Sequence, residues 1–451
     1  MMALLSKQLY LFGRFIGIVV LCLAGACSIL AQQAKPPAAP PQSNDAKNGE
    51  FAAAADEVLE QMSDITALKL RTPLKKSLRT REEIRAHVIE QMNDEKDPKE
   101  RYAGERSAEA FGLLPKGFDL DSFMIELLTE QIAGLYDPKA HEFYVADWIP
   151  IADQRMVMAH ELTHALEDQH FQIDAWVKAA RPNDDAELAR DAVLEGSAMA
   201  AMVEYLLSGT GRSLKDLPDI DPSMLVGDMT STPMLKKAPP FIRDALVFPY
   251  LGGLTFSAAV LKQEGWSALP GIFAKPPVST QQILHPEMYR SGKVPMPLSL
   301  PSMDKDLGDG WVKLEDNLMG EFGWREVFKQ FLGDVNAKTL SAGWDGDRYI
   351  VYEQKQSKRL LLITRERLAT EEQAGQFFSQ YSQALQKKHP QRTNTVDLSS
   401  FLSFDTPDGG VFLRCVEKEC ITFEGGDRTM FVALNKSLNW SALPEAAGKR
   451  Q

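Results

Sequence analysis

The feature that most restricts the fold of this chain is a short apolar run that also contains histidine and glutamate. Residues 156–170 read MVMAHELTHALEDQH and contain the motif His-Glu-x-x-His at positions 160–164. On an α-helix, residues four apart share one face and lie about 6 Å apart along the axis. The imidazoles of His160 and His164 can therefore bind one metal ion from the same face. The Met, Val, Ala and Leu residues around them predict that this helix is buried.

The glutamate between the two histidines has a position suited to acid–base chemistry. Glu161 lies about 100° around a helix from His160, which places it beside a metal ion held by His160 and His164. A carboxylate there can take a proton from a metal-bound water, as in a zinc hydrolase. A chain with seven histidines contains this motif by chance in roughly one case in a hundred. The alternative is a pair of hydrogen-bonded histidines on a surface helix, which the apolar flanks disfavour.

Two residues compete to be the third ligand that a catalytic Zn²⁺ site needs in addition to a water. Glu195 lies in a second run rich in Ala and Met (LEGSAMAAMVEYLL), where an acid is costly unless it is paired or binds a metal. A helix-capping or ion-paired role for Glu195 is the alternative. His170 occupies the third histidine position of metzincins, H-E-x-x-H-x-x-G-x-x-H. That arrangement needs a glycine where this chain has Glu167, and a continuing helix would carry His170 about 15 Å from His160.

A zinc hydrolase also needs a hydrogen-bond donor for the oxyanion that develops on its substrate. His285, which precedes Pro286, is the first candidate. Tyr289, Tyr250 and Tyr205 are alternatives. A capping or packing role explains His285 equally well, so the sequence leaves the identity of this donor open.

The amino terminus has the pattern of an export signal. Residues 1–31 contain Lys7 and Arg14, followed by an apolar run from Phe15 to Ala31, and residues 32–50 are rich in Pro and Ala. This pattern predicts a signal peptide or anchor and then a linker. We therefore expect an exported protein that is periplasmic, secreted or membrane-anchored, and that contacts a membrane only through this anchor or an attached lipid.

Export also affects the interpretation of the cysteines. Cleavage of the signal fits after Ala26 or after Ala31, and Cys27 would allow a lipid anchor instead. Cys415 and Cys420 are separated by a short polar turn (VEKE) between two strand-like runs. In an oxidising compartment we expect them to form a disulfide across a hairpin. The alternative is two buried thiols.

Length and composition exclude several classes of protein. The 451 residues, 44% of them apolar, are enough for two or three domains with their own cores. A net charge of −12 is unsuited to non-specific nucleic-acid binding, which needs a basic surface. No internal segment approaches the ~18 apolar residues of a membrane span, so we expect none beyond the amino terminus.

Three regions follow the expected linker, and together they predict an α+β protein. Residues 51–114 have a charged helical pattern. Residues 115–300 combine helices with a strand at Glu142–Ala146, which could pair with an extended peptide. Residues 301–451 are expected to form a linker and a small α+β domain. Within it we predict strands at 348–353 and 360–364, a helix at 371–388 and two or three strands between 411 and 434.

The run around the motif resembles gluzincin zinc metallopeptidases of the thermolysin-like, peptidase-MA-like kind. More closely, it is similar to a largely uncharacterised group of exported bacterial proteins. These share a Tyr-Asp-Pro turn, an HELxHALxDQHF helix, a Glu-Gly-x-Ala helix and a Ser-Thr-x-Gln-x-Leu-His-Pro segment. The corresponding residues of this chain are 136–138, 160–171, 195–198 and 279–286. The resemblance covers about residues 115–300 and implies a zincin-like catalytic domain.

The resemblance implies that the two motif histidines and Glu195 bind Zn²⁺ and that Glu161 is the general base. Thermolysin-like enzymes place an Asp four residues after the ligand Glu, where this chain has Met199. Asp191 could orient a ligand histidine instead. The expected function is hydrolysis of a peptide or protein substrate by a zinc-bound water. The rival interpretations are an inactive zincin-like binding protein and a structural envelope protein without a metal.

Overall fold

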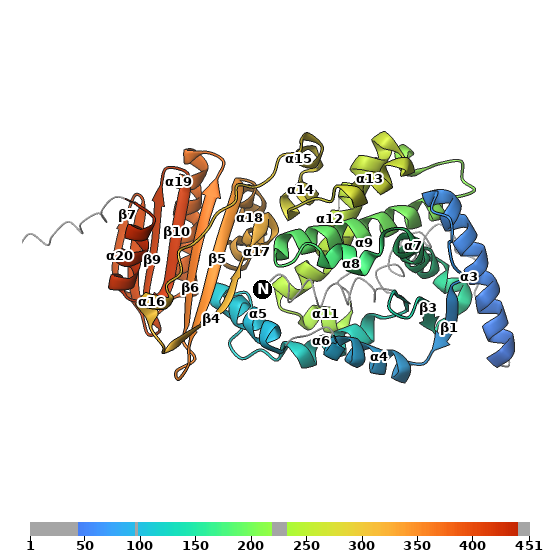
Figure 1. The fold of residues 1–451 in the computed structure, drawn as a ribbon, viewed down its shortest axis with the longest axis horizontal. Helices are drawn as coiled ribbons and strands as arrows, with labels where there is room; N and C mark the ends of the chain where they lie inside the picture. Colours follow the sequence, from blue (N-terminus) through green and yellow to red (C-terminus); the bar gives the residue numbers. More distant parts are fainter. Residues whose placement is uncertain (1–43, 95–97, 219–231, 441–451) are drawn as a thin grey trace, which may run out of the picture.

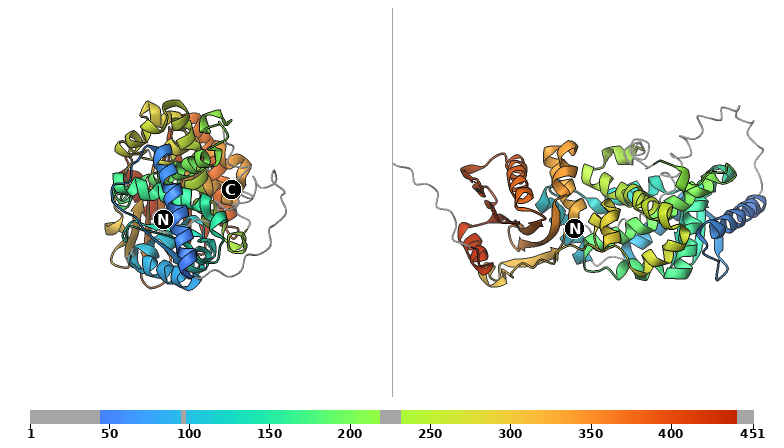
Figure 2. Two further views of the ribbon diagram at one scale, coloured as in Figure 1. Left: turned by 90° about the vertical axis from the view of Figure 1, so that its right-hand side faces the viewer. Right: turned by 90° about the horizontal axis from the view of Figure 1, so that it is seen from above.

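The structure is a computed structural model that describes residues 44–94, 98–218 and 232–440. Helices form most of one end of the described molecule, and a large antiparallel sheet forms the other end (Figures 1 and 2). The mixture of helices and sheets confirms the predicted α+β class. The export signal expected in residues 1–31 lies outside the described residues, as does most of the expected linker.

The amino-terminal region contains a strand that the sequence did not predict. Its elements are α3 (Asn44–Thr66), β1 (Lys75–Arg79), α4 (Arg81–Asp94), α5 (Pro98–Phe111) and α6 (Leu120–Gln131). Helix α3 begins inside the expected linker and crosses the end of the molecule that faces away from the large sheet (Figure 2). The sequence of β1, KKSLR, has no clear apolar alternation. It is a strand because it pairs in parallel with β3.

Strands β2 (Gly134–Asp137) and β3 (Glu142–Ala146) complete a three-stranded sheet of order β1-β3-β2. The structure confirms the predicted strand at Glu142–Ala146. Because β3 has a hydrogen-bonded neighbour on each side, its backbone is not available to a peptide. The expectation that this strand accepts an extended peptide is therefore wrong, because the edges of the sheet are β1 and β2.

The helices that follow surround the predicted motif. Helix α7 (Arg155–Phe171) packs against α3 and against α9 (Asp184–Leu207), and α9 packs along α12 (Pro240–Glu264). These contacts bury the apolar residues of α7 in a core that extends from α3 to the large sheet. Shorter helices connect and flank them: α8 (Ile173–Lys178), α11 (Pro233–Lys237), α13 (Leu269–Ala274), α14 (Thr280–Leu284) and α15 (Pro286–Ser291), with single 3₁₀ turns at Ile151–Gln154, Leu214–Asp216 and Trp266–Ala268.

Helix α12 corrects one expectation from the sequence. By length and composition it could cross a membrane, although we expected no internal segment of that kind. In the structure 72% of its most apolar window is buried inside the fold, where it packs against α9. Its apolar character is therefore accounted for by its position as a core helix.

The carboxyl-terminal region forms a seven-stranded antiparallel sheet of order β4-β5-β6-β10-β9-β8-β7. Helix α19 packs on one face of this sheet, and α16 and α20 pack on the other. The elements are α16 (Asp304–Leu307), β4 (Trp311–Asn317), α17 (Gly320–Leu332), α18 (Asp334–Ser341), β5 (Trp344–Gln354), β6 (Leu360–Leu368), α19 (Glu371–Lys388), β7 (Thr393–Leu398), β8 (Phe401–Thr406), β9 (Gly409–Val416), β10 (Glu419–Gly426) and α20 (Arg428–Ser437).

The predictions for this region are confirmed in part. Strands β5 and β6 include the two predicted strands, and α19 has the predicted limits. Between residues 411 and 434 the chain forms two strands and then α20, so a third strand there is wrong. Cys415 and Cys420 lie opposite each other on β9 and β10 and form the expected disulfide.

Candidate metal centre

Helix α7 presents the motif to the interior of the protein. The side chains of His160 and Glu161 are fully buried, and His164 is 4% exposed. The helix continues without a break through Glu167 and ends at Phe171, and the next residue, Gln172, has a left-handed backbone conformation. The predicted buried helix is therefore present, and the whole motif, residues 160–164, lies within it.

Three side chains from α7 and α9 converge on one point. The Nε2 atoms of His160 and His164 are 3.2 Å apart, and they lie 3.1 Å and 3.6 Å from Oε2 of Glu195. Ligand atoms held by one tetrahedral zinc ion at about 2.0–2.1 Å lie about 3.3 Å from each other. The spacing and the donor types fit a zinc ion. Among the described residues these three form the group that could hold a metal.

Electrostatics in this group favours a bound positive charge. Burial lowers the pKa of His160 below its usual value. Burial also opposes the charged form of His164, but the carboxylates of Glu195 and Glu167 outweigh it and raise the pKa of His164 well above its usual value. Burial alone would raise the pKa of Glu195, but the imidazoles hold it below its usual value. Two carboxylates around two imidazoles thus attract a proton, and a metal cation can take its place.

Glu161 has the environment of a proton acceptor. The backbone N–H of Tyr136 in β2 donates to its Oε2 at 3.0 Å, which holds the side chain beside the ligand group. Its Oε1 is buried and has no hydrogen-bond partner among the described residues. Burial raises the pKa of this carboxyl well above its usual value. One carboxylate oxygen is therefore fixed, and the other is free to receive a proton.

A close contact between two helices explains the Glu-Gly pair in α9. A Cβ atom on Gly196 would lie 2.1 Å from the carbonyl oxygen of Gly253 in α12, and a Cβ on Gly253 would lie 2.0 Å from that of Ala192. Only glycine at both positions lets the helices approach this closely. The contact places Tyr250, one turn before Gly253, over His160 with the ring planes 27° apart. Burial, followed by the charges of Glu195 and Glu161, raises the pKa of the Tyr250 hydroxyl well above its usual value.

The structure separates the four candidates for an oxyanion donor. Tyr250 touches the ligand group, as described above. His285 Nε2 instead lies 2.9 Å from Oε1 of Glu321 in α17, a contact that raises the pKa of His285. Tyr289 donates to the Lys275 carbonyl at 2.8 Å, and Tyr205 lies near the side chain of Arg155, whose pKa it helps Glu57 to raise.

His170 lies away from the ligand group. Its Nε2 is 2.8 Å from the Lys69 carbonyl oxygen, near the exposed end of α7. The unbroken helix through Glu167 has the geometry expected when the metzincin glycine is missing. The third member of the converging group is Glu195.

Two polar residues of the centre were not identified from the sequence. Oε2 of Glu167 lies 3.3 Å from Nδ1 of His164, and Ser197 donates to Oε1 of Glu167 at 2.5 Å. All of these side chains are buried. The sequence feature that could have identified Glu167 is its position, three residues after a candidate ligand histidine in a segment predicted to be buried. Asp191, the expected orienting residue, is also buried on α9, and its charge adds to burial and Glu195 in raising the pKa of Tyr250.

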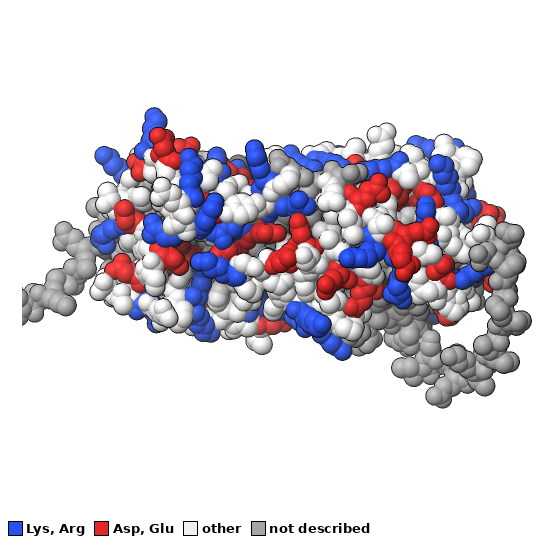
Figure 3. Space-filling model, turned by 90° about the horizontal axis from the view of Figure 1, so that it is seen from below, with Lys and Arg blue, Asp and Glu red and all other residues white. Residues whose placement is uncertain are grey.

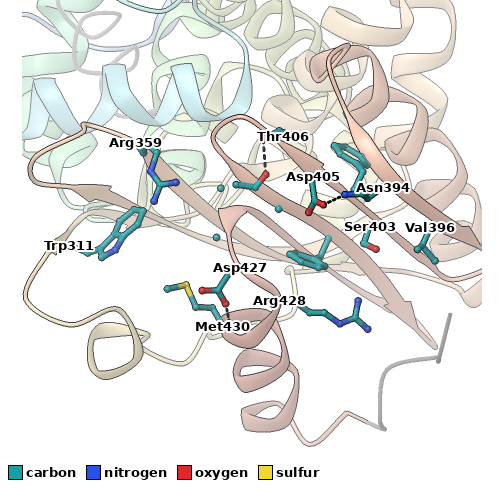
Figure 4. Close-up of a pocket in the computed structure, with 16 residues that line it drawn as sticks. Trp311, Arg359, Asn394, Val396, Ser403, Asp405, Thr406, Asp427, Arg428 and Met430 are labelled. Carbon is teal, nitrogen blue, oxygen red and sulfur yellow. Dashed lines mark hydrogen bonds between the residues drawn. The ribbon is translucent and has the colours of Figure 1, made fainter.

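A separate hollow of about 520 Å³ lies on the large sheet, at the opposite end of the molecule from α7 (Figures 1 and 4). Arg359 and Arg428 line it together with two carboxylates. Asp405 accepts a hydrogen bond from Asn394 at 2.7 Å, and Asp427 accepts one from the backbone of Met430 at 2.9 Å. This mixture of charges singles out no class of ligand.

Among the comparisons with known proteins, the family match lies in the large-sheet region. A family described as a domain of unknown function (DUF8575) matches residues 312–414, from β4 to β9. No curated protein matches the chain. Among solved structures, one from Chloroflexus aurantiacus, provisionally described as a hydrolase with a novel fold, is 16% identical. The match covers 62% of this chain and 99% of that chain, with a TM-score of 0.34. The chemistry of the centre therefore has to be argued from its own residues.

Proposed function

We propose that this chain is a zinc-dependent metallopeptidase of the gluzincin type. The observation that carries the proposal is the convergence of His160, His164 and Glu195 on one point, with the unpaired oxygen of Glu161 in the same buried region. A site that only stabilised the fold would be expected to have four protein ligands. Three ligands leave a position for water, and a carboxylate next to that position has a purpose only if the water reacts.

The donor set supports zinc as the metal. Two imidazole nitrogens and one carboxylate oxygen are ligands that zinc accepts, and they are the set found in gluzincin sites. A Mg²⁺ or Ca²⁺ site would be built mainly from oxygen atoms. The distances among the three ligand atoms suit a tetrahedral ion.

The residues of the chain have separate tasks in the proposed reaction. A bound zinc ion supplies an acidified water and polarises the substrate carbonyl. Glu161 holds the proton taken from that water on its Oε1 and later transfers it to the leaving amine. The Tyr136 N–H keeps the other oxygen of Glu161 in place throughout. Tyr250, which stacks on His160, is the best-placed of the four candidates to stabilise the oxyanion.

We further propose that the protein is exported and acts on peptides or proteins outside the cytoplasm. The amino-terminal pattern of residues 1–31 supports export. The disulfide between Cys415 and Cys420 provides separate support, because such bonds persist mainly in oxidising compartments. Residues 115–300 are proposed as the catalytic domain, with a helical segment before it and an α+β domain after it.

The proposal is tested by cleavage of an unstructured protein. The zinc-loaded protein should cleave it, a chelator should stop the reaction, and added zinc should restore it. Glu161→Gln keeps the shape of the side chain but removes the base, so it should retain zinc and lose activity by orders of magnitude. A zinc-loaded wild type that does not cleave would favour an inactive zincin-like protein. Loss of zinc from Glu161→Gln would mean that this residue supports the structure.

A further inference from the structure

In each candidate ligand histidine, Nδ1 is the ring nitrogen that does not face the metal position. The two histidines differ in the hydrogen-bond partner of this nitrogen. Nδ1 of His164 lies 3.3 Å from Oε2 of Glu167. Nδ1 of His160 is buried and has no hydrogen-bond partner among the described residues. A neutral histidine carries its proton on one nitrogen, and the metal must bind the other. Only His164 therefore has a neighbour that selects the tautomer with a free Nε2.

Glu167 also connects the two helices that supply the ligands. It belongs to α7, as does His164, and its Oε1 accepts a hydrogen bond from Ser197 of α9. Ser197 is two residues from Glu195 in the same helix. The distance between a ligand of α7 and the ligand of α9 is therefore fixed by a bridge through one buried carboxylate.

We propose that Glu167 is a positioning residue of the metal centre, which holds His164 in its metal-binding tautomer and couples α7 to α9 through Ser197. The residue four positions after Glu195 is Met199, so α9 supplies no acid there. The carboxylate next to His164 comes instead from Glu167 of the same helix, α7. This inference rests on the metal-binding part of the proposed function.

The inference predicts how variants of Glu167 bind zinc. Glu167→Leu removes the acceptor and should weaken zinc binding by about 10–100-fold, the usual effect of losing such a partner. Glu167→Gln can still accept from Nδ1 with its carbonyl oxygen while its amide faces Ser197, so its affinity should stay close to that of the wild type. Ser197→Ala should cause a smaller loss than Glu167→Leu. The measurement is competition for zinc with a chromophoric chelator.

A matched control separates positioning from a general effect on the core. Thr163→Val also removes a buried polar group of α7, one whose hydroxyl bonds only to the Ala159 carbonyl among the described residues, and it should leave zinc affinity unchanged. The absorption spectrum of the Co²⁺ form should change for Glu167→Leu and recover for Glu167→Gln. If Glu167 only supported the structure, Glu167→Leu would lower the unfolding temperature of the metal-free protein and would not change zinc affinity or the Co²⁺ spectrum.

The outcomes distinguish failure of this inference from failure of the proposed function. If the wild-type protein bound no zinc, both the proposed function and the role of Glu167 would be wrong. Wild-type protein that binds zinc as tightly as Glu167→Leu would overturn the inference alone. Equal weakening in Glu167→Leu and Thr163→Val would overturn it too, because the effect would then follow from any change in α7.

Discussion

At the scale of single residues, the centre depends on how each buried carboxylate is held. Glu195 lies against the imidazoles of His160 and His164. Glu167 accepts a hydrogen bond from the Ser197 hydroxyl, and Glu161 accepts one from a backbone N–H. Burying a carboxylate is costly unless hydrogen bonds or a cation compensate. These three contacts stabilise the acids individually and leave the point between the ligand atoms for a cation.

Replacing Tyr250 tests a further neighbour of Glu195. Tyr250→Phe removes the hydroxyl on which the Glu195 charge acts, and the interaction of a hydroxyl with a charged group contributes about 1.5–3 kcal/mol. We therefore expect zinc affinity to fall by about tenfold or more. Tyr289→Phe is the matched control, because its hydroxyl donates to the Lys275 carbonyl. A larger loss of affinity in Tyr289→Phe than in Tyr250→Phe would show that the wrong tyrosine has been assigned.

The sequence predicted the residues that converge and missed the residues that support them. His160 and His164 follow from helix spacing, and Glu195 from the cost of an acid in an apolar run. Glu167 and Tyr250 could not be chosen in this way. Their roles depend on where α9 and α12 cross, and that crossing is set by the contact between Gly196 and Gly253.

At the scale of elements, the predictions succeeded where a segment carries its own pattern. Helix α19 has clear helical periodicity, and β3 is a short apolar run. Strands β1 and β7 lack such a pattern, and they form because each pairs with a neighbouring strand. A possible third strand was expected between residues 411 and 434, where the chain forms α20 after β10.

Asp185 provides a test of the junction between the helices and the large sheet. At the start of α9 it accepts hydrogen bonds from the backbone N–H and the hydroxyl of Thr280 in α14, at 3.1 Å and 2.5 Å. Burial outweighs these bonds and raises its pKa from 3.8 to about 7. Between these values the folded protein holds a proton that the unfolded chain has lost. The stability that Asp185 contributes is therefore present below about pH 4 and is lost as the pH rises through 7.

Asp185→Asn removes this titration. Relative to the wild type, the free energy of unfolding of the variant should increase by about 2–3 kcal/mol between about pH 5 and pH 8. Denaturant unfolding of both proteins at the two pH values measures the difference. If the difference between the two proteins were the same at both values, the carboxyl of Asp185 would have an ordinary pKa.

At the scale of the whole molecule, acidic residues outnumber basic ones. The chain has a net charge of −12, but acidic and basic side chains are interspersed on the face seen from below (Figure 3). The expectation that the protein does not bind nucleic acid rests on the net charge and stays a prediction. The metal centre and the large sheet occupy different ends (Figure 1), and residues 312–414 of the sheet region are those that match a family.

The metal content of purified protein tests whether His160, His164 and Glu195 form a zinc site. Elemental analysis should find one zinc ion per chain in the wild type. Glu195→Ala loses a ligand and should lose the zinc, whereas His170→Ala should keep it because His170 bonds to the Lys69 carbonyl at the far end of α7. Wild-type protein without zinc would contradict the zinc site. Zinc kept by Glu195→Ala and lost by His170→Ala would contradict the assignment of Glu195 as the third ligand.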